Sequence, residues 1–131
     1  MADREASRSC GQLVATVVGD PRRISICHCL ACQRRTGSAF GVQSRFDRDQ
    51  VRITGTSHAY TRVSDEGEER TTHFCPECGA TVIIASNSTP DTLGIPVGAF
   101  ADPAFPAPTV SVWEDRMHHW VELPPGIQHL D

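Results

Sequence analysis

The stretch Cys27-His-Cys-Leu-Ala-Cys32 places three thiols close together in the chain. In an extended strand, residues i and i+2 point the same way, so Cys27 and Cys29 can face one point. Residues i and i+3 meet across one helical turn, which can bring Cys32 to the same point. Three converging thiolates suit a soft, tetrahedral cation such as Zn²⁺. The stretch therefore predicts a metal site.

A second cysteine pair, Cys75-Pro-Glu-Cys78, repeats the two-residue spacing and is followed by Gly79. Glycine permits the sharp backbone turn that usually closes such a pair around a metal. The sixth cysteine, Cys10, lies near the start of the sequence. We therefore expect all six cysteines to be zinc ligands: Cys10, Cys27, Cys29, Cys32, Cys75 and Cys78.

Two other interpretations of the cysteines stay open. An even number of cysteines allows a disulfide framework. Against it, the charged residues 1–5 are not followed by an apolar segment, so no export signal is predicted. Two cysteines separated by a single residue would also close a strained ring. The other interpretation is a redox role for one Cys-x-x-Cys pair.

The composition predicts one globular domain over residues 1–131, with 39% hydrophobic residues. The net charge is −4, and acidic and basic residues are interspersed, which argues against a general nucleic-acid binder. Apolar stretches fall far short of the roughly 20 residues that a membrane-spanning helix needs. Reduced cysteines without an export signal predict the cytoplasm. The oligomeric state cannot be inferred from the sequence.

Short stretches of alternating apolar and polar residues, separated by turn signals, predict an all-β domain of antiparallel strands with less than about 15% helix. The predicted strands span residues 12–18, 23–29, 39–46, 51–54, 58–63, 70–74, 80–85, 93–97 and 109–113. Residues 30–36 are expected to form about one helical turn that ends at Gly37. The polar start, 1–9, is expected to be frayed. Pro96 suggests that the strand at 93–97 is an edge strand or carries a bulge.

Five segments of the sequence resemble those of one known family. They are Cys10-Gly-Gln-Leu13, Cys27-His-Cys-Leu-Ala-Cys-Gln-Arg-Arg-Thr-Gly-Ser-Ala-Phe40, Phe74-Cys-Pro-Glu-Cys-Gly-Ala80, Pro96-Val-Gly-Ala-Phe-Ala-Asp-Pro103 and Val112-Trp113. From Cys10 to Trp120 the chain resembles the glutathione-dependent formaldehyde-activating enzyme family, which includes centromere protein V. The resemblance implies an Mss4-like β-tent, bound zinc and carbon–sulfur lyase activity. The family reaction joins glutathione reversibly to formaldehyde, giving S-(hydroxymethyl)glutathione. The implied partners are a small thiol such as glutathione and a small aldehyde.

The family pattern implies a catalytic zinc on Cys27, Cys29 and Cys32, and a structural zinc on Cys10, Cys75 and Cys78. The chain departs from the pattern at one place, because Cys-x-Cys-Gly of the family is Arg8-Ser-Cys-Gly11 here. Arginine cannot bind zinc, so the structural site lacks one thiolate. The first cluster, water or another side chain would supply the fourth ligand. One or two zinc ions per chain are therefore expected.

Three thiolates with an open fourth position are typical of a reactive zinc site. Zinc can hold an incoming thiol as thiolate or polarise an aldehyde oxygen, and either effect serves a thiol that adds to a carbonyl. Glutathione carries two carboxylates, which the fork of an arginine side chain matches. Arg34 and Arg35 directly follow Cys32 and are the expected substrate-binding residues. A solvated turn or a structural ion pair would also account for them.

Three histidines, His28, His118 and His119, are expected to differ in their position relative to the predicted metal site. His28 lies between two metal-directed thiols and should point away from them. His118 and His119 could reach the site as acid–base groups.

The main functional prediction is a zinc-dependent carbon–sulfur lyase that acts on a thiol–aldehyde adduct. The alternative is a non-catalytic zinc-binding β-tent with a binding or folding role. A sulfoxide reductase of the same fold is less consistent with the sequence, because those proteins carry two Cys-x-x-Cys pairs and a separate redox cysteine.

Overall fold

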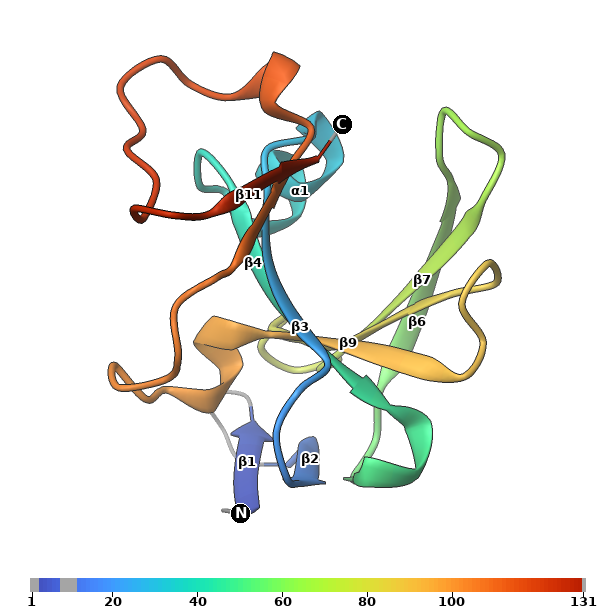
Figure 1. Cartoon of the computed structure of the whole chain (residues 1–131). Coiled ribbons are helices and arrows are strands. Elements are labelled where there is room, and N and C mark those ends of the chain that lie inside the picture. The colour runs from blue at the N-terminus through green and yellow to red at the C-terminus, as the bar shows by residue number, and fades with distance from the viewer. Residues whose placement is uncertain (1–2, 8–11, 131) are drawn as a thin grey trace.

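The computed structural model describes residues 3–7 and 12–130. Within these ranges the chain forms two β-sheets, a short α-helix and three 3₁₀ helices (Figure 1). The strands are β1 (Asp3–Ser7), β2 (Val14–Val18), β3 (Arg23–Cys27), β4 (Gly41–Asp47), β5 (Val51–Thr54), β6 (His58–Val63), β7 (Glu69–Phe74), β8 (Thr81–Ser86), β9 (Thr92–Pro96), β10 (Val110–Val112) and β11 (Gln128–Leu130). The helices are α1 (Leu30–Thr36), η1 (Arg48–Gln50), η2 (Val97–Phe100) and η3 (Glu114–Arg116).

The smaller sheet has the strand order β1-β2-β5, and the larger sheet has the order β11-β10-β3-β4-β9-β8-β7-β6. In Figure 1 the small sheet lies at the bottom, α1 and β11 lie at the upper left, and the β6–β7 hairpin lies at the right. The larger sheet thus bends so that its two ends rise on either side of β9. The predicted all-β fold with little helix is confirmed.

The hydrophobic core lies between the two sheets. Leu13, Ala15 and Val17 are fully buried along the segment that includes β2, as their alternation in the sequence predicts. They pack in one cluster with Phe46 of β4 and Ile95 of β9, which are also fully buried. Burial of each large apolar side chain contributes about 1.5–3 kcal/mol. The core therefore fixes β4 and β9, which lie in the middle of the larger sheet.

The predicted strands all form, with ends that differ by at most two residues. The helical segment also forms with the predicted bounds, but its 7 residues make about two turns where one was expected. Gly37 has a φ of 69°, in the left-handed region, and its N–H donates to the carbonyl of Gln33 at 2.8 Å. This bond satisfies one of the last carbonyl groups of α1.

Two expectations about individual segments are corrected. Within the supposedly frayed start, residues 3–7 pair with β2 along their whole length, because Ala6 is buried in the core. β9 is not an edge strand: it lies between β4 and β8, and Pro96 is its last residue, so its missing N–H interrupts little of the ladder.

The strands are also not all antiparallel. β10 runs parallel to β3 and to β11, and β11 has no counterpart among the predicted strands. A proline-rich crossing that includes Pro103, Pro106 and Pro108 returns the chain beside β3 in the same direction. The pairing joins residues more than 80 positions apart, so it has no local sequence signal.

Candidate metal centre

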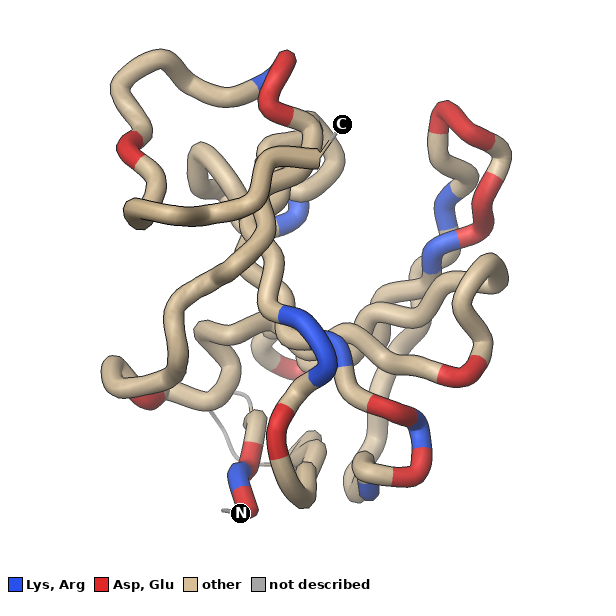
Figure 2. Tube along the Cα trace, in the orientation of Figure 1, with Lys and Arg blue, Asp and Glu red and all other residues tan. Residues whose placement is uncertain are grey.

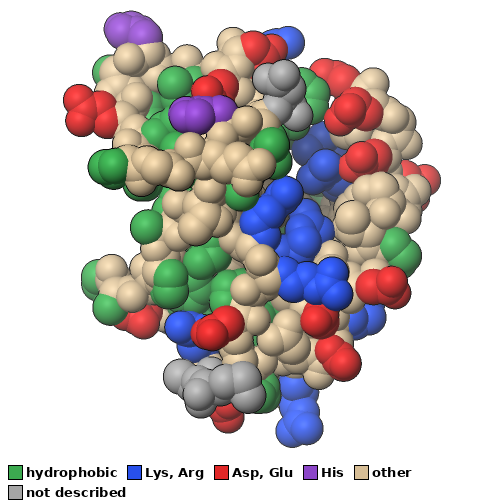
Figure 3. Space-filling model, viewed as in Figure 1, with side chains coloured by type: hydrophobic (Ala, Val, Ile, Leu, Met, Phe, Trp, Pro, Cys, Tyr) green, Lys and Arg blue, Asp and Glu red, His purple; other side chains and the backbone are tan. Residues whose placement is uncertain are grey.

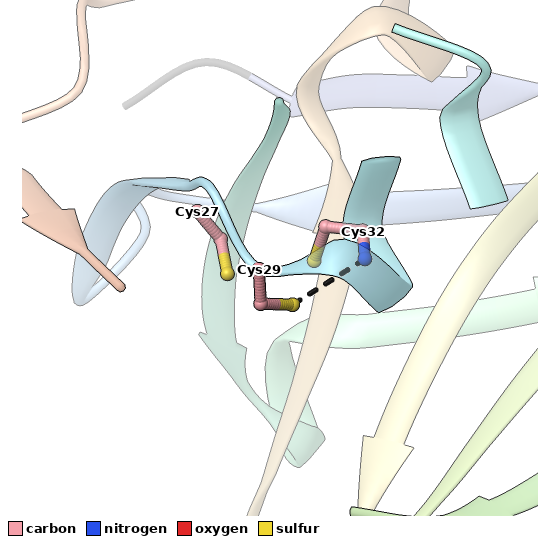
Figure 4. Close-up of side chains that lie close together, drawn as sticks. All are labelled: Cys27, Cys29 and Cys32. Carbon is pink, nitrogen blue, oxygen red and sulfur yellow. Dashed lines mark hydrogen bonds between the residues drawn. The ribbon is translucent and has the colours of Figure 1, made fainter. Parts of the chain in front are cut away.

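The thiols of Cys27, Cys29 and Cys32, here called the thiol cluster, converge where β3 meets α1 (Figure 4). Cys27 is the last residue of β3, Cys29 is the N-cap of α1, and Cys32 lies in the first turn of α1. Their Sγ atoms all lie within 4.8 Å of one another. Cys27 and Cys32 are buried and Cys29 is half-buried. The convergence predicted from the spacing is therefore present.

The thiol cluster fits a soft tetrahedral cation. Sulfur ligands at about 2.3 Å from zinc lie about 3.8 Å from one another, so small side-chain movements would close the site around the ion. The donors are all sulfur, which favours zinc over hard cations such as Mg²⁺. Within the described residues, the group of possible ligands contains these three cysteines and no fourth member. A metal held here would keep a position for another ligand.

Hydrogen bonds preorganise the thiol cluster to carry negative charge. The backbone N–H of Cys32 donates to Sγ of Cys29 at 3.3 Å, at the N-terminus of α1. Gln43 of β4 donates through Nε2 to Sγ of Cys32 at 3.8 Å. Donors of this kind favour a thiolate over a neutral thiol.

The pKa values of the three thiols are driven apart by their mutual hydrogen bonds. Hydrogen bonds from Cys27 and Cys32 lower the pKa of Cys29 to about 2. Hydrogen bonds to Cys29 and Cys32, together with burial, raise the pKa of Cys27. The bond with Cys27 lowers the pKa of Cys32, but its bond to Cys29 and burial raise it overall. These shifts favour ionisation of Cys29 before Cys27 and Cys32, and binding of a cation would release the protons that remain.

Two arginines also act on the thiol cluster through their charge. Arg62 of β6 lowers the pKa of Cys29, and Arg35 of α1 lowers the pKa of Cys32. Arg35 packs against Gly41, where an added Cβ would lie 2.9 Å from its Nη2 and 3.4 Å from Cβ of Cys32. This Nη2 is buried, and no hydrogen-bond partner for it exists among the described residues. By contrast, Arg34 is exposed on α1.

His28 points away from the thiol cluster, as expected. It is fully buried, and its Nε2 lies 3.1 Å from Oγ of Ser111 on β10. Burial lowers the pKa of His28, so the ring is held neutral. Its role in the fold is to join the end of β3 to β10.

His118 and His119 are exposed. His118 places Nε2 2.9 Å from Oε1 of Gln33, which lies on α1 directly after Cys32. The predicted acid–base role of His118 or His119 stays a prediction.

The second cysteine pair forms a tight turn after β7. Sγ of Cys75 accepts the N–H groups of Glu77 and Cys78 at 3.2 and 3.4 Å. Gly79 has a φ of 79°, and its N–H donates to the carbonyl of Cys75 at 2.8 Å. Cys75 is fully buried, Cys78 is exposed, and neither belongs to the thiol cluster. The turn thus brings the backbone of Cys78 to Sγ of Cys75.

The remaining parts of the predicted structural site, Cys10 and the departure at Arg8, lie outside the described residues. Cys27, Cys29, Cys32 and Cys78 are free thiols, so the disulfide interpretation does not apply to them.

Residues 3–116 match the family model described as glutathione-dependent formaldehyde-activating enzyme. The chain belongs to this family. Among solved structures, it is similar to a crystal structure of a Rhodobacter sphaeroides protein, with a TM-score of 0.55 and 19% sequence identity. The match covers 78% of this chain and 90% of that chain, and at this identity it supports the fold alone. No curated protein gives a significant sequence match.

A cysteine cluster that could hold a metal ion agrees with membership of the formaldehyde-activating enzyme family. Of the helices in residues 3–7 and 12–130, none has the length and apolar character needed to cross a membrane.

Several arginines that share the sheet face of Cys27 were not among the predicted site residues. Arg23 lies four residues before Cys27 on β3, hence on the same face, and pairs with Arg45 on β4. On the hairpin opposite, Arg62 of β6 pairs with Arg70 of β7. The alternation from Arg23 to Cys27 was a signal available in the sequence, whereas the other positions depend on strand pairing.

Proposed function

We propose that the protein is a zinc-dependent carbon–sulfur lyase that joins a small thiol such as glutathione reversibly to a small aldehyde such as formaldehyde. In this addition a sulfur–carbon bond forms, the carbonyl π bond breaks, and the thiol proton ends on the aldehyde oxygen. The observation that carries the proposal is the convergence of Cys27, Cys29 and Cys32 within 4.8 Å, with no fourth protein ligand in the described part of the chain.

Cys27, Cys29 and Cys32 are the proposed ligands of a catalytic zinc. When bound there, the ion would hold the substrate thiol as a thiolate or polarise the aldehyde oxygen. Cys75 and Cys78, with Cys10, are the proposed ligands of a second, structural zinc. Each chain would then bind two ions, or one if the two sites share a ligand.

The chain's own residues would prepare the thiol cluster for an anionic substrate. Donation from the N–H of Cys32 and from Gln43 disperses the charge of the cluster. Arg35 supports the proposal most directly among the expected substrate-binding residues, because its Nη2 is buried beside Cys32 and unpartnered within the described ranges. A carboxylate or carbonyl oxygen of the substrate would satisfy it. Arg34, one position earlier and exposed, is the weaker member of the pair.

Stepwise chelation combined with a turnover assay tests the function. Zinc-loaded protein should release two populations of zinc to a chelator, and glutathione should speed release of the weaker one. With ¹³C-formaldehyde and glutathione, NMR exchange between the two reactants and their adduct should be faster with the protein than without it. The Cys29→Ser variant should lose the weaker zinc population and the faster exchange.

One result would instead favour a non-catalytic zinc-binding module. That result is a single zinc, insensitive to glutathione, together with exchange no faster than in buffer.

A further inference from the structure

A second feature of the sheet face that carries Cys27 is a hollow lined with arginines, here called the basic hollow. Its volume is about 490 Å³, which suits a small ligand. Arg22, Arg23, Arg45 and Arg70 line it, with Glu68 and three hydroxyl-bearing residues. Figure 3 shows the basic side chains gathered at the centre of this view, and all of them are arginines because the chain contains no lysine.

The positive charge of the basic hollow is only partly balanced. Arg22 pairs with Asp47, and Arg70 pairs with Glu68. Arg45 donates to the hydroxyls of Thr89 and Thr92, at 3.1 and 3.0 Å, which carry no charge.

Arg23 and Arg45 have no ion-pair partner among residues 3–7 and 12–130. Burial lowers the pKa of Arg45, and the charges of Arg23 and Arg70 lower it further, while the charge of Glu68 acts in the opposite direction. Like charges held together in a half-buried site favour binding of an anion.

The basic hollow and the thiol cluster lie on one continuous sheet face. Arg23 and Cys27 are separated by four residues of β3, or about 13 Å at strand spacing. Between them, Ser25 pairs with Gln43, and Gln43 reaches Sγ of Cys32. A tripeptide spans about 10 Å, and the long arginine side chains can reach across the rest of the distance between Arg23 and Cys27.

We propose that Arg23, Arg45 and Arg70 bind a carboxylate of an acidic peptide thiol whose sulfur lies at the thiol cluster. This subsite rests on the proposed function for its ligand and extends it, because it makes the acidic end of the thiol a specificity determinant. Arg35 would serve the part of the substrate next to the sulfur, and the basic hollow would serve its distal end.

Binding of S-methylglutathione tests the subsite separately from catalysis, since this probe keeps both carboxylates and lacks the reactive thiol. Zinc-loaded protein is titrated calorimetrically with S-methylglutathione and with its diethyl ester, in which both carboxylates are neutral. The Arg23→Gln and Arg70→Gln variants should each bind S-methylglutathione about tenfold more weakly and bind the ester unchanged. The matched control is Arg52→Gln, which removes an exposed arginine of β5 in the smaller sheet and should leave both affinities unchanged.

Three outcomes would overturn the subsite. They are no binding of S-methylglutathione to the wild-type protein, equal binding of the ester, and an equal loss of affinity in Arg52→Gln, which would indicate a diffuse field of charge. Turnover is measured on the same samples. Arginine-dependent binding of S-methylglutathione without turnover would refute the proposed lyase activity and support the subsite. Turnover together with unchanged affinity in Arg23→Gln would support the lyase activity and refute the subsite.

Discussion

At the residue scale, Cys29 has two separable roles. It caps α1 through the bond from the N–H of Cys32, and it is the member of the thiol cluster whose pKa is lowered. Serine is a good N-cap residue but a poor ligand for a soft cation. Replacement by serine therefore removes one role and keeps the other.

We expect Cys29→Ser to lose one zinc per chain while its melting temperature without zinc stays close to that of the metal-free wild type. The reason is that the serine hydroxyl still caps α1. Cys29→Ala should lose the same zinc and also about 1 kcal/mol of stability, because the cap is gone. Metal analysis and thermal melts after chelation measure both effects. Equal stability of the two variants would show that the cap has no energetic importance.

Two glycines with positive φ differ in the space around them. Gly55 has a φ of 98°, and a Cβ there would lie 1.8 Å from the carbonyl oxygen of Gln12. Gly67, at a φ of 86° in the β6–β7 turn, has no atom within 4 Å of that position.

Gly67→Ala should destabilise the fold by about 1–2 kcal/mol through backbone strain alone. Gly55→Ala should cost at least about 2 kcal/mol more, because the backbone at Gln12 must move. Denaturant unfolding measures the difference. Similar losses in the two variants would mean that the approach of residue 55 to Gln12 is not close.

At the scale of elements, Gln33 ties α1 to the C-terminal segment. Its Nε2 donates to the carbonyls of His28 and Arg116, at 2.8 and 3.1 Å, and its Oε1 lies 2.9 Å from Nε2 of His118. One side chain thus holds the loop after η3 against the helix that carries Cys32.

Gln33→Ala should destabilise the protein by about 1–3 kcal/mol and speed hydrogen exchange at the amide of Val121, which bonds to His118. Arg34→Ala, one position later on the exposed side, should stay within about 0.5 kcal/mol of the wild type. Urea unfolding and exchange measured by NMR provide the two readouts. Unchanged exchange at Val121 would show that the segment is held by other contacts.

At the scale of the whole molecule, groups of acidic and of basic side chains lie at different places. The net charge is −4, and four acidic residues lie in and beside the turn between β6 and β7, namely Asp65, Glu66, Glu68 and Glu69 (Figure 2). Four of the twelve arginines, Arg22, Arg23, Arg45 and Arg70, line the basic hollow on the sheet face that leads to the thiol cluster. Although the protein has a net negative charge, its basic hollow thus offers a positively charged surface to an anionic ligand.

Cys78→Ser should lose the more tightly held zinc and melt at a markedly lower temperature. The turn at residues 75–80 joins β7 to β8, whose Val82 and Ile83 lie in the core, so loss of its metal would loosen the pairing of these two strands. Metal content and calorimetric melting with saturating zinc measure the effect. An unchanged zinc content and melting temperature would remove Cys78 from the ligands.

Local features of this protein were determined by the sequence alone. The alternation of apolar residues predicted the strands, Gly37 predicted the end of α1, and the spacing of Cys27, Cys29 and Cys32 predicted that their thiols converge. These features depend on the backbone geometry of a few neighbouring residues, so the chain encodes them wherever the segment lies in the fold.

Other features were decided only by tertiary structure. The parallel pairing of β10 with β3, the central place of β9 and the gathering of Arg23, Arg45 and Arg70 all join segments that are far apart in the sequence. Even Arg34 and Arg35, adjacent in sequence, differ because α1 packs one of them against Gly41 of β4. The free energy of such contacts depends on which partner is present, and residue type and spacing do not specify that partner.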